Sequence, residues 1–173
     1  MHAGTLTTIE FDRVVEAVVS YALTPLGARK LAELRPLTDR RGVQTALGLT
    51  SEGVRYLTAN RSLPLEAPTD LETILAKLAI EAQPLDPLDL RKLADFLQSV
   101  DTTCRGVQAA SGGPYPALRT LVDGSATWSR ECGVVRKKID GVGEIADDAS
   151  PELKTIRSRL RKQRHRLRGN LES

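Results

Sequence analysis

The sequence predicts an all-α fold, an irregular bundle of about seven helices from which a C-terminal helix protrudes. Aromatic residues make up only 3% of the chain, too few for the β-sandwiches and barrels that depend on them. Leu, Ala, Arg and Glu are abundant instead, and apolar residues recur at helical spacing in segments separated by Pro and Gly. With 173 residues, 40% of them hydrophobic, the chain is long enough to bury a core as one domain.

Three helices are expected in the N-terminal third of the chain. After an approach turn at residues 5–9, apolar side chains at helical spacing predict a helix over residues 11–22. Thr24-Pro25 then starts a second helix, which ends before Pro36 and forms a tight hairpin with the first. A third and longer helix begins at Thr38-Asp39, with one apolar face turned inward and glycines spaced for the close approach of another helix. The inward residues are Val43, Ala46, Leu47, Val54 and Leu57, and the glycines are Gly42, Gly48 and Gly53.

The remainder of the predicted bundle follows a connector at residues 60–68. A helix is expected over residues 70–82, and Asp86-Pro87 repeats the cap-plus-proline start for a helix that continues to about residue 108. A loop at residues 110–116 contains Gly112-Gly113-Pro114, and it leads to shorter helices at 118–122 and 126–139. No repeat period indicates a solenoid.

The last helix has the clearest start signals of the chain, at Ser150-Pro151-Glu152-Leu153. Ser150 can cap the helix, Pro151 fits its first position, and Glu152 suits the positive end of the helix dipole. From Ser150 onward the chain has eight Lys or Arg against two acidic residues, a local net charge of +6, whereas the whole chain carries only +3. We therefore divide the chain into a helical domain at residues 1–149 and a basic protruding helix at residues 150–173.

Two interpretations of the basic helix remain open at this point. Clustered Lys and Arg on one helix are typical of a nucleic-acid contact, because they neutralise phosphates. A thin apolar seam with charges on the other sides is equally typical of an arm that docks against partner helices, from this protein or from a second copy of the chain. The candidate nucleic-acid contacts are a ridge of Arg157, Arg161, Arg164 and Arg168, with Lys162 and Arg166 beside it; the seam is Leu153, Ile156, Leu160, Leu167 and Leu171.

The sequence predicts no catalytic, cofactor or metal site in this chain. Gly141 to Ala146 matches G-x-G-x-x-A, but the strand before it and the acid about 20 residues later that a dinucleotide site needs are both missing, so we expect a small turn or a two-stranded loop. The phosphate-binding pattern G-x-x-x-x-G-K-[S/T] does not occur. Asp147-Asp148 is interpreted as linker charge favoured by the following helix dipole rather than as a Mg²⁺ site. Cys104 and Cys132 lack metal-ligand spacing and are expected to be small buried or half-buried residues.

Neither a membrane span nor a secretory signal is predicted. No run approaches the roughly 20 apolar residues that a transmembrane helix requires. The N-terminus has no basic region followed by an apolar stretch. The expected location is the cytoplasm.

Three sequence blocks together resemble one protein family. They are residues 5–15, residues 24–27 with 34–39, and the junction at residues 140–153, which contains Ala149-Ser150-Pro151-Glu152-Leu153. These blocks, and the spacing between them, look like the N-terminal region of the type-two (second-paralogue) branch of bacterial MutS proteins, in the DNA mismatch repair MutS family. The resemblance covers essentially the whole chain.

The resemblance implies that the chain is part of a larger machine. In such proteins the helical core runs into long lever helices that lead to a DNA-embracing clamp and return to an ATPase that uses ATP and Mg²⁺; many end in a small Smr nuclease domain. The family acts as a homodimeric clamp on branched or duplex DNA, linked to suppression of recombination and, in some members, to splitting collided ribosomes. By this resemblance, residues 1–149 are the first part of the core domain, residues 150–173 are the start of a truncated lever helix, and the chain itself is not an enzyme.

Overall fold

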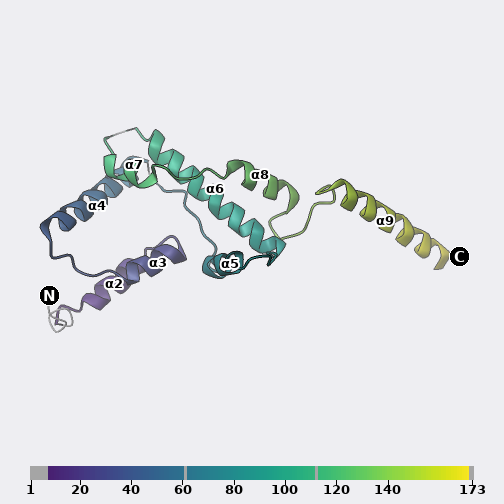
Figure 1. Ribbon diagram of the computed structural model, residues 1–173, viewed down its shortest axis with the longest axis horizontal. Coiled ribbons are helices and arrows are strands. Elements are labelled where there is room, and N and C mark those ends of the chain that lie inside the picture. Colours follow the sequence, from purple (N-terminus) through teal and green to yellow (C-terminus); the bar gives the residue numbers. More distant parts are fainter. Residues whose placement is uncertain (1–7, 61, 112, 172–173) are drawn as a thin grey trace.

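The computed structural model describes residues 8–60, 62–111 and 113–171. Over these ranges the chain forms eight helices and no named strand, which confirms the all-α class. They are α2 (Phe11–Val19), α3 (Pro25–Ala32), α4 (Arg40–Asn60), α5 (Leu71–Leu78), α6 (Pro87–Ala109), α7 (Pro116–Val122), α8 (Ser129–Lys138) and α9 (Pro151–Leu171). Figure 1 shows an elongated molecule with α6 at its centre, the α2–α3 hairpin near the N-terminal end, and α9 projecting at the other end.

The predicted cap residues start the helices as expected. The side chain of Thr24 accepts a hydrogen bond from the backbone N–H of Gly27 at 3.0 Å, and that of Asp86 accepts one from Leu88 at 2.9 Å. The Asp39 carboxylate likewise accepts the N–H of Gly42 at 2.6 Å, at the start of α4. These bonds satisfy backbone donors that a helix leaves unpaired in its first turn.

Four predicted helices are shorter in the structure; α3 ends at Ala32 rather than just before Pro36, and α8 spans Ser129–Lys138 rather than residues 126–139. Helix α2 ends at Val19 rather than Ala22, where the Ser20 hydroxyl donates to the carbonyl of Ala17 at 2.7 Å. Helix α5 ends at Leu78, and Ala82 has a positive φ of 61°, a conformation that cannot continue a right-handed helix. Of the approach turn predicted at residues 5–9, residues 5–7 lie outside the described part of the chain.

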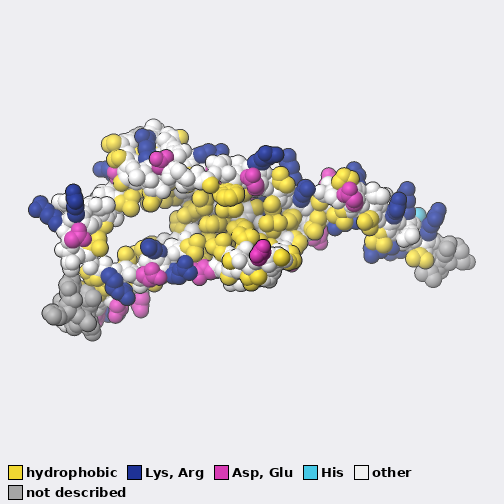
Figure 2. Space-filling view, viewed as in Figure 1, with side chains coloured by type: hydrophobic (Ala, Val, Ile, Leu, Met, Phe, Trp, Pro, Cys, Tyr) yellow, Lys and Arg dark blue, Asp and Glu magenta, His cyan; other side chains and the backbone are white. Residues whose placement is uncertain are grey.

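Helix α6 is the central helix of the fold, because each of the two clusters of buried hydrophobic residues includes a residue from it. The first cluster joins Leu71 and Ile74 of α5 to Leu93 of α6, and Leu26 of α3 packs against it. The second joins Val107 of α6 to Tyr56 and Tyr115, whose rings meet edge to face at 5.6 Å between centroids. Hydrophobic atoms accordingly gather over the middle of the molecule, near α5 and α6 (Figure 2).

Ionic contacts reinforce the packing around α6. The Lys77 ammonium of α5 lies 2.7 Å from the Asp89 carboxylate, and Lys92 lies 2.6 Å from Asp70. At the other end of α6, the buried Asp101 accepts hydrogen bonds from Arg105 and from the hydroxyl of Ser129. Ser129 is the first residue of α8, so this contact positions α8 along α6.

The predicted inward face of α4 is largely wrong, because four of its five residues are exposed and Val43 is half-buried. Leu47, Val54 and Leu57 are 62%, 60% and 44% exposed, and Gly48 and Gly53 face open space rather than another helix. The buried residues of α4 are Glu52 and Tyr56, both in its C-terminal half; α4 packs against α7, and Tyr56 also joins the cluster with Val107 of α6. The Glu52 carboxylate accepts the backbone N–H of Leu118 at 3.0 Å and so caps the first turn of α7.

Replacing Glu52 by alanine should lower the free energy of unfolding by about 1 to 2 kcal/mol, because the first turn of α7 loses its acceptor. Glu52→Gln keeps a side-chain oxygen at the same place and should cost less. Glu81 is exposed, so Glu81→Ala serves as a control for the loss of one carboxylate. Urea denaturation measures all three variants, and equal midpoints for Glu52→Ala and Glu81→Ala would contradict the capping role.

Candidate functional site at the root of helix α9

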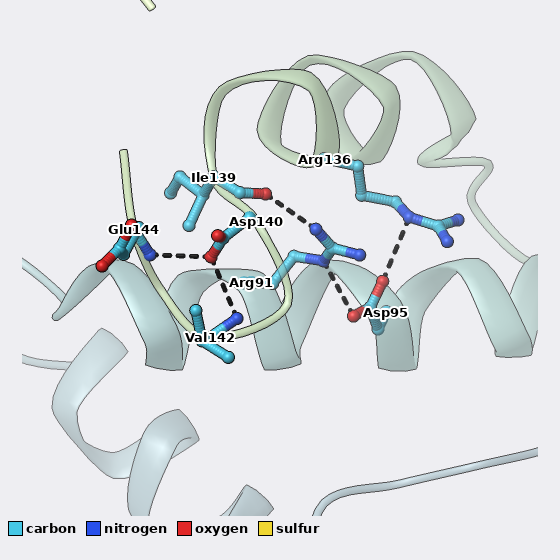
Figure 3. Close-up of polar contacts among 7 residues, drawn as sticks. All are labelled: Arg91, Asp95, Arg136, Ile139, Asp140, Val142 and Glu144. Carbon is cyan, nitrogen blue, oxygen red and sulfur yellow. Dashed lines mark hydrogen bonds and ion pairs between the residues drawn. The ribbon is translucent and has the colours of Figure 1, made fainter. Parts of the chain in front are cut away.

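A tight turn at residues 139–146 connects α8 to the segment before α9. Ile139 and Ile145 form an antiparallel bridge, and the backbone N–H of Ala146 donates to the carbonyl of Lys138 at 2.8 Å. The Asp140 carboxylate closes the turn by accepting the backbone N–H groups of Val142 at 3.0 Å and Glu144 at 2.8 Å (Figure 3). The sequence predicted a small turn or a two-stranded loop here in place of a dinucleotide site, and the structure has a turn closed by one bridge.

The 139–146 turn is held against helix α6. The Arg91 guanidinium of α6 donates to the carbonyl of Ile139 at 2.7 Å and pairs with Asp95 at 2.9 Å (Figure 3). Asp95 in turn lies 3.1 Å from the Nε of Arg136, near the end of α8. At the tip of the turn, Gly143 lies so close to α6 that a Cβ built on it would be 2.8 Å from the Cβ of Leu88. These contacts fix the turn to both helices.

Helix α9 is tied to this turn through two of its arginines. The Arg157 guanidinium donates to the carbonyl of Ile145 at 2.7 Å and to the Asp147 carboxylate at 2.6 Å. Arg161 lies one helical turn later and contacts the second oxygen of Asp147 at 2.9 Å. Asp147, which the sequence suggested to be a linker charge, is therefore the partner of two residues predicted to contact nucleic acid. We call Asp147, Arg157 and Arg161 the root clamp.

The junction residues behave as the sequence predicted. The Ser150 hydroxyl accepts the backbone N–H of Leu153 at 3.2 Å, and Pro151 is the first residue of α9. Hydrogen bonding to its own backbone amide and to Ser150 lowers the pKa of Glu152. The start of α9 is thus stabilised by a cap and by a carboxylate at the positive end of the helix.

The pKa of Asp147 is lowered, chiefly by the hydrogen bond from Arg157 and further by the charge of Arg161. Because the folded-state pKa lies below the unfolded value, the stabilising contribution of the clamp is present above the ordinary aspartate pKa. It is lost as the pH falls through the lowered folded-state value. An NMR titration of the Asp147 carboxyl should therefore show an acid-shifted midpoint that returns toward the ordinary range in Arg157→Gln. An unshifted midpoint in the wild-type chain would contradict the clamp.

The outer half of α9 carries the remaining candidate contacts in an exposed position. The structure brings Arg161, Arg164 and Arg168 together around one shallow hollow that also includes His165 and Leu167. Lys162 and Arg166 are exposed beside it, and within the described residues none of Lys162, Arg164, Arg166 and Arg168 makes an ion pair. Figure 2 shows Lys and Arg side chains along α9. The predicted ridge is thus divided into two clamped arginines at the root and two unpaired ones beyond it.

The predicted apolar seam of α9 lies mostly open to solvent. Leu153 is half-buried at the root, whereas Ile156, Leu160 and Leu167 are 61%, 44% and 63% exposed. The side chain of Leu171 lies outside the described residues. An exposed seam on a charged helix is a face available to another helix.

Nothing in the described ranges indicates a metal centre or a membrane segment. No group of three or more His, Cys, Asp or Glu residues there has a metal-binding arrangement. None of the described helices has the length and hydropathy of a transmembrane span. Cys104 is half-buried and Cys132 is buried, as predicted, and burial raises the pKa of the Cys132 thiol.

Comparison with known proteins supports the resemblance seen in the sequence. No protein-family model matches the chain. Over its whole length, however, the chain is 31% identical to endonuclease MutS2 of Symbiobacterium thermophilum, of which it covers 21%. It is 30% identical to endonuclease MutS2 of Geobacillus kaustophilus and 29% identical to that of Bacillus velezensis, and it covers 22% of each. The chain spans about a fifth of the length of these curated relatives, and over that length it is similar to a segment of a MutS2 protein.

Proposed function

We propose that this chain is a non-catalytic structural and coupling segment that links the ATPase of a MutS2-type protein to its DNA clamp. The observation that supports this role is the continuous set of bonds from α6, through the 139–146 turn, to the root of α9. Arg91 holds the turn to α6, and Arg157 holds α9 to the turn. A helix that leaves a domain in a fixed direction can transmit a movement of that domain to whatever lies at its far end.

The activity of the whole protein is proposed from the resemblance. By analogy with the family, the parent is a homodimeric, ATP- and Mg²⁺-dependent ATPase, with a nuclease domain in many members. It acts on branched or duplex DNA in suppression of recombination, or on collided ribosomes. The segment described here contributes to those activities by orienting the lever rather than by performing chemistry.

Loosening the root clamp in a full-length MutS2 protein that contains this segment tests the coupling role. Arg157→Gln removes the bonds from α9 to Ile145 and Asp147, whereas Arg159→Gln removes the same charge from an exposed position on the same helix. Coupling predicts that Arg157→Gln loses most of the stimulation of the ATPase by DNA, keeps its basal rate, and differs from Arg159→Gln. Full DNA stimulation in Arg157→Gln, or in a protein whose lever is severed at Ser150, would refute the proposal.

A second candidate function is direct binding of nucleic acid by α9. The exposed, unpaired Lys162, Arg164, Arg166 and Arg168 favour it. If the helix neutralises about four phosphates, a plot of the logarithm of the binding constant against the logarithm of the salt concentration should have a slope of about −3.6. Salt-titrated binding of the 173-residue chain to duplex DNA, branched DNA and RNA measures this slope. No binding at low salt would exclude this second candidate.

The exposed seam favours a third candidate, homotypic pairing of α9 with a second copy. Ile156, Leu160 and Leu167 would then be covered by the same residues of the other chain. Sedimentation at high concentration distinguishes the cases, since a monomer would exclude pairing through this face.

A further inference from the structure

We propose that Asp147 gates a phosphodiester-binding face on α9. In the chain alone, its carboxylate pairs with Arg157 and Arg161. The phosphates of a nucleic acid can bind these two arginines only after the carboxylate releases them. This inference rests on the second candidate function above, binding of nucleic acid by α9, and it adds a control element to that function.

The positions of the four arginines make one continuous face. Arg157, Arg161, Arg164 and Arg168 follow the spacing of three or four residues that places side chains on the same side of a helix. At a rise of about 1.5 Å per residue, the face extends for about 16 Å along α9. Its outer half lines the shallow hollow around Arg164 and Arg168, and its inner half is occupied by Asp147.

Asp147 binds these arginines as a phosphate group would. Each of its two oxygens accepts from a different guanidinium, at 2.6 Å from Arg157 and at 2.9 Å from Arg161. Guanidinium groups bind carboxylates and phosphates through the same donors and with similar geometry, so the two anions compete for one pair of side chains. The Asp147 side chain is 49% exposed, and solvent-exposed ion pairs of this kind are weak. A polyanion can therefore displace the carboxylate.

The two arginines are not held equally. Among the described residues, the guanidinium of Arg161 pairs with Asp147 alone, whereas that of Arg157 also donates to the carbonyl of Ile145. Arg161 should therefore be released first. Release of Arg157 also breaks the bond between α9 and the 139–146 turn. Because coupling between two sites is reciprocal, a movement that pulls α9 from the turn should in the same way expose both arginines to phosphate.

Matched substitutions at adjacent aspartates test the gate. Asp147→Asn removes the carboxylate that holds the arginines, and Asp148→Asn removes the same charge one residue away, at an exposed side chain outside the clamp. Both variants are measured against the wild-type 173-residue chain with fluorescein-labelled short duplex DNA and duplex RNA over a range of salt concentrations. Circular dichroism first verifies that the helix content of each variant is unchanged.

The gate predicts that Asp147→Asn binds several-fold more tightly than Asp148→Asn at equal salt. Its log–log salt slope should be steeper by about 0.9 for each arginine released, and by about 1.8 if both are released. The gain should disappear in an Arg157→Gln/Arg161→Gln background, because no arginine is left to release. Binding of both DNA and RNA would identify the phosphodiester backbone as the ligand. Binding of one alone would show which of the two nucleic acids supplies that backbone.

The experiment distinguishes failure of the gate from failure of the nucleic-acid function. Equal affinities and slopes for Asp147→Asn and Asp148→Asn, in chains that do bind duplex, would overturn the gate and leave binding by the outer half of α9 intact. No binding by any variant at low salt, Asp147→Asn included, would overturn the gate together with the nucleic-acid function on which it rests.

Discussion

Replacing Gly143 by alanine is expected to lower the free energy of unfolding by about 2 to 4 kcal/mol. Gly143 has a φ of 86°, in the left-handed region that costs any residue with a Cβ. The added Cβ would lie 2.8 Å from the Cβ of Leu88 and 3.1 Å from its Cα, so backbone as well as side chain must move. Leu88 donates the N–H that Asp86 accepts at the start of α6, and the substitution should therefore disturb that cap as well.

Two other glycines separate the causes of this effect. Gly124 has a φ of 73° and no atom near its added Cβ, so Gly124→Ala reports backbone strain alone, at about 1 kcal/mol. Gly141, in the same turn as Gly143, has neither a positive φ nor a close neighbour, and Gly141→Ala should change stability by less than about 0.5 kcal/mol. Urea denaturation ranks the three. A Gly143→Ala variant no less stable than Gly124→Ala would show that the turn does not press against α6.

Replacing Leu71 by alanine should have a comparable or larger effect, about 2 to 5 kcal/mol. Leu71 is fully buried between α5 and α6, where it contacts the cluster of Ile74 and Leu93. Its removal leaves a cavity that α5, a helix of eight residues, can fill only by moving along α6. The α2–α3 hairpin should loosen at the same time, because Leu26 of α3 packs on this cluster.

The matched control lies on the same helix. Leu78 is 54% exposed, so Leu78→Ala makes the same chemical change with little loss of packing and should cost less than about 1 kcal/mol. Thermal and urea unfolding should both place Leu71→Ala well below Leu78→Ala. Similar stabilities of the two variants would mean that α5 and α6 do not enclose a hydrophobic core.

The helix starts could be predicted from the sequence because they are local. At Thr24, Asp86 and Ser150 the capping side chain and the N–H that it accepts are two or three residues apart, so one short stretch of sequence contains both partners. The turn at Asp140 was predictable for the same reason, since its carboxylate bonds backbone groups two and four residues later.

Burial and pairing were harder to predict because they depend on distant residues. The apolar stripe of α4 identified a face that could be buried, but the residues that the fold buries are Glu52 and Tyr56, which contact α7 and α6. Asp147 had no sequence signal for its role beyond acidity, since its partners are ten and fourteen residues away across a helix start. The sequence predicted the ridge at residues 157–168 as one surface. It did not predict that Asp147 would pair with the first two of its arginines and leave the other two unpaired.

The cap that Glu52 provides to α7 also has a consequence for the order in which the chain folds. Glu52 and the backbone amide of Leu118 are 66 residues apart in the sequence. At a synthesis rate of roughly 5 to 20 residues per second, Glu52 leaves the ribosome about 3 to 13 s before its partner. During that interval the Glu52 carboxylate lacks the N–H that it accepts, so the cap that joins α4 to α7 can form only after Leu118 has been made.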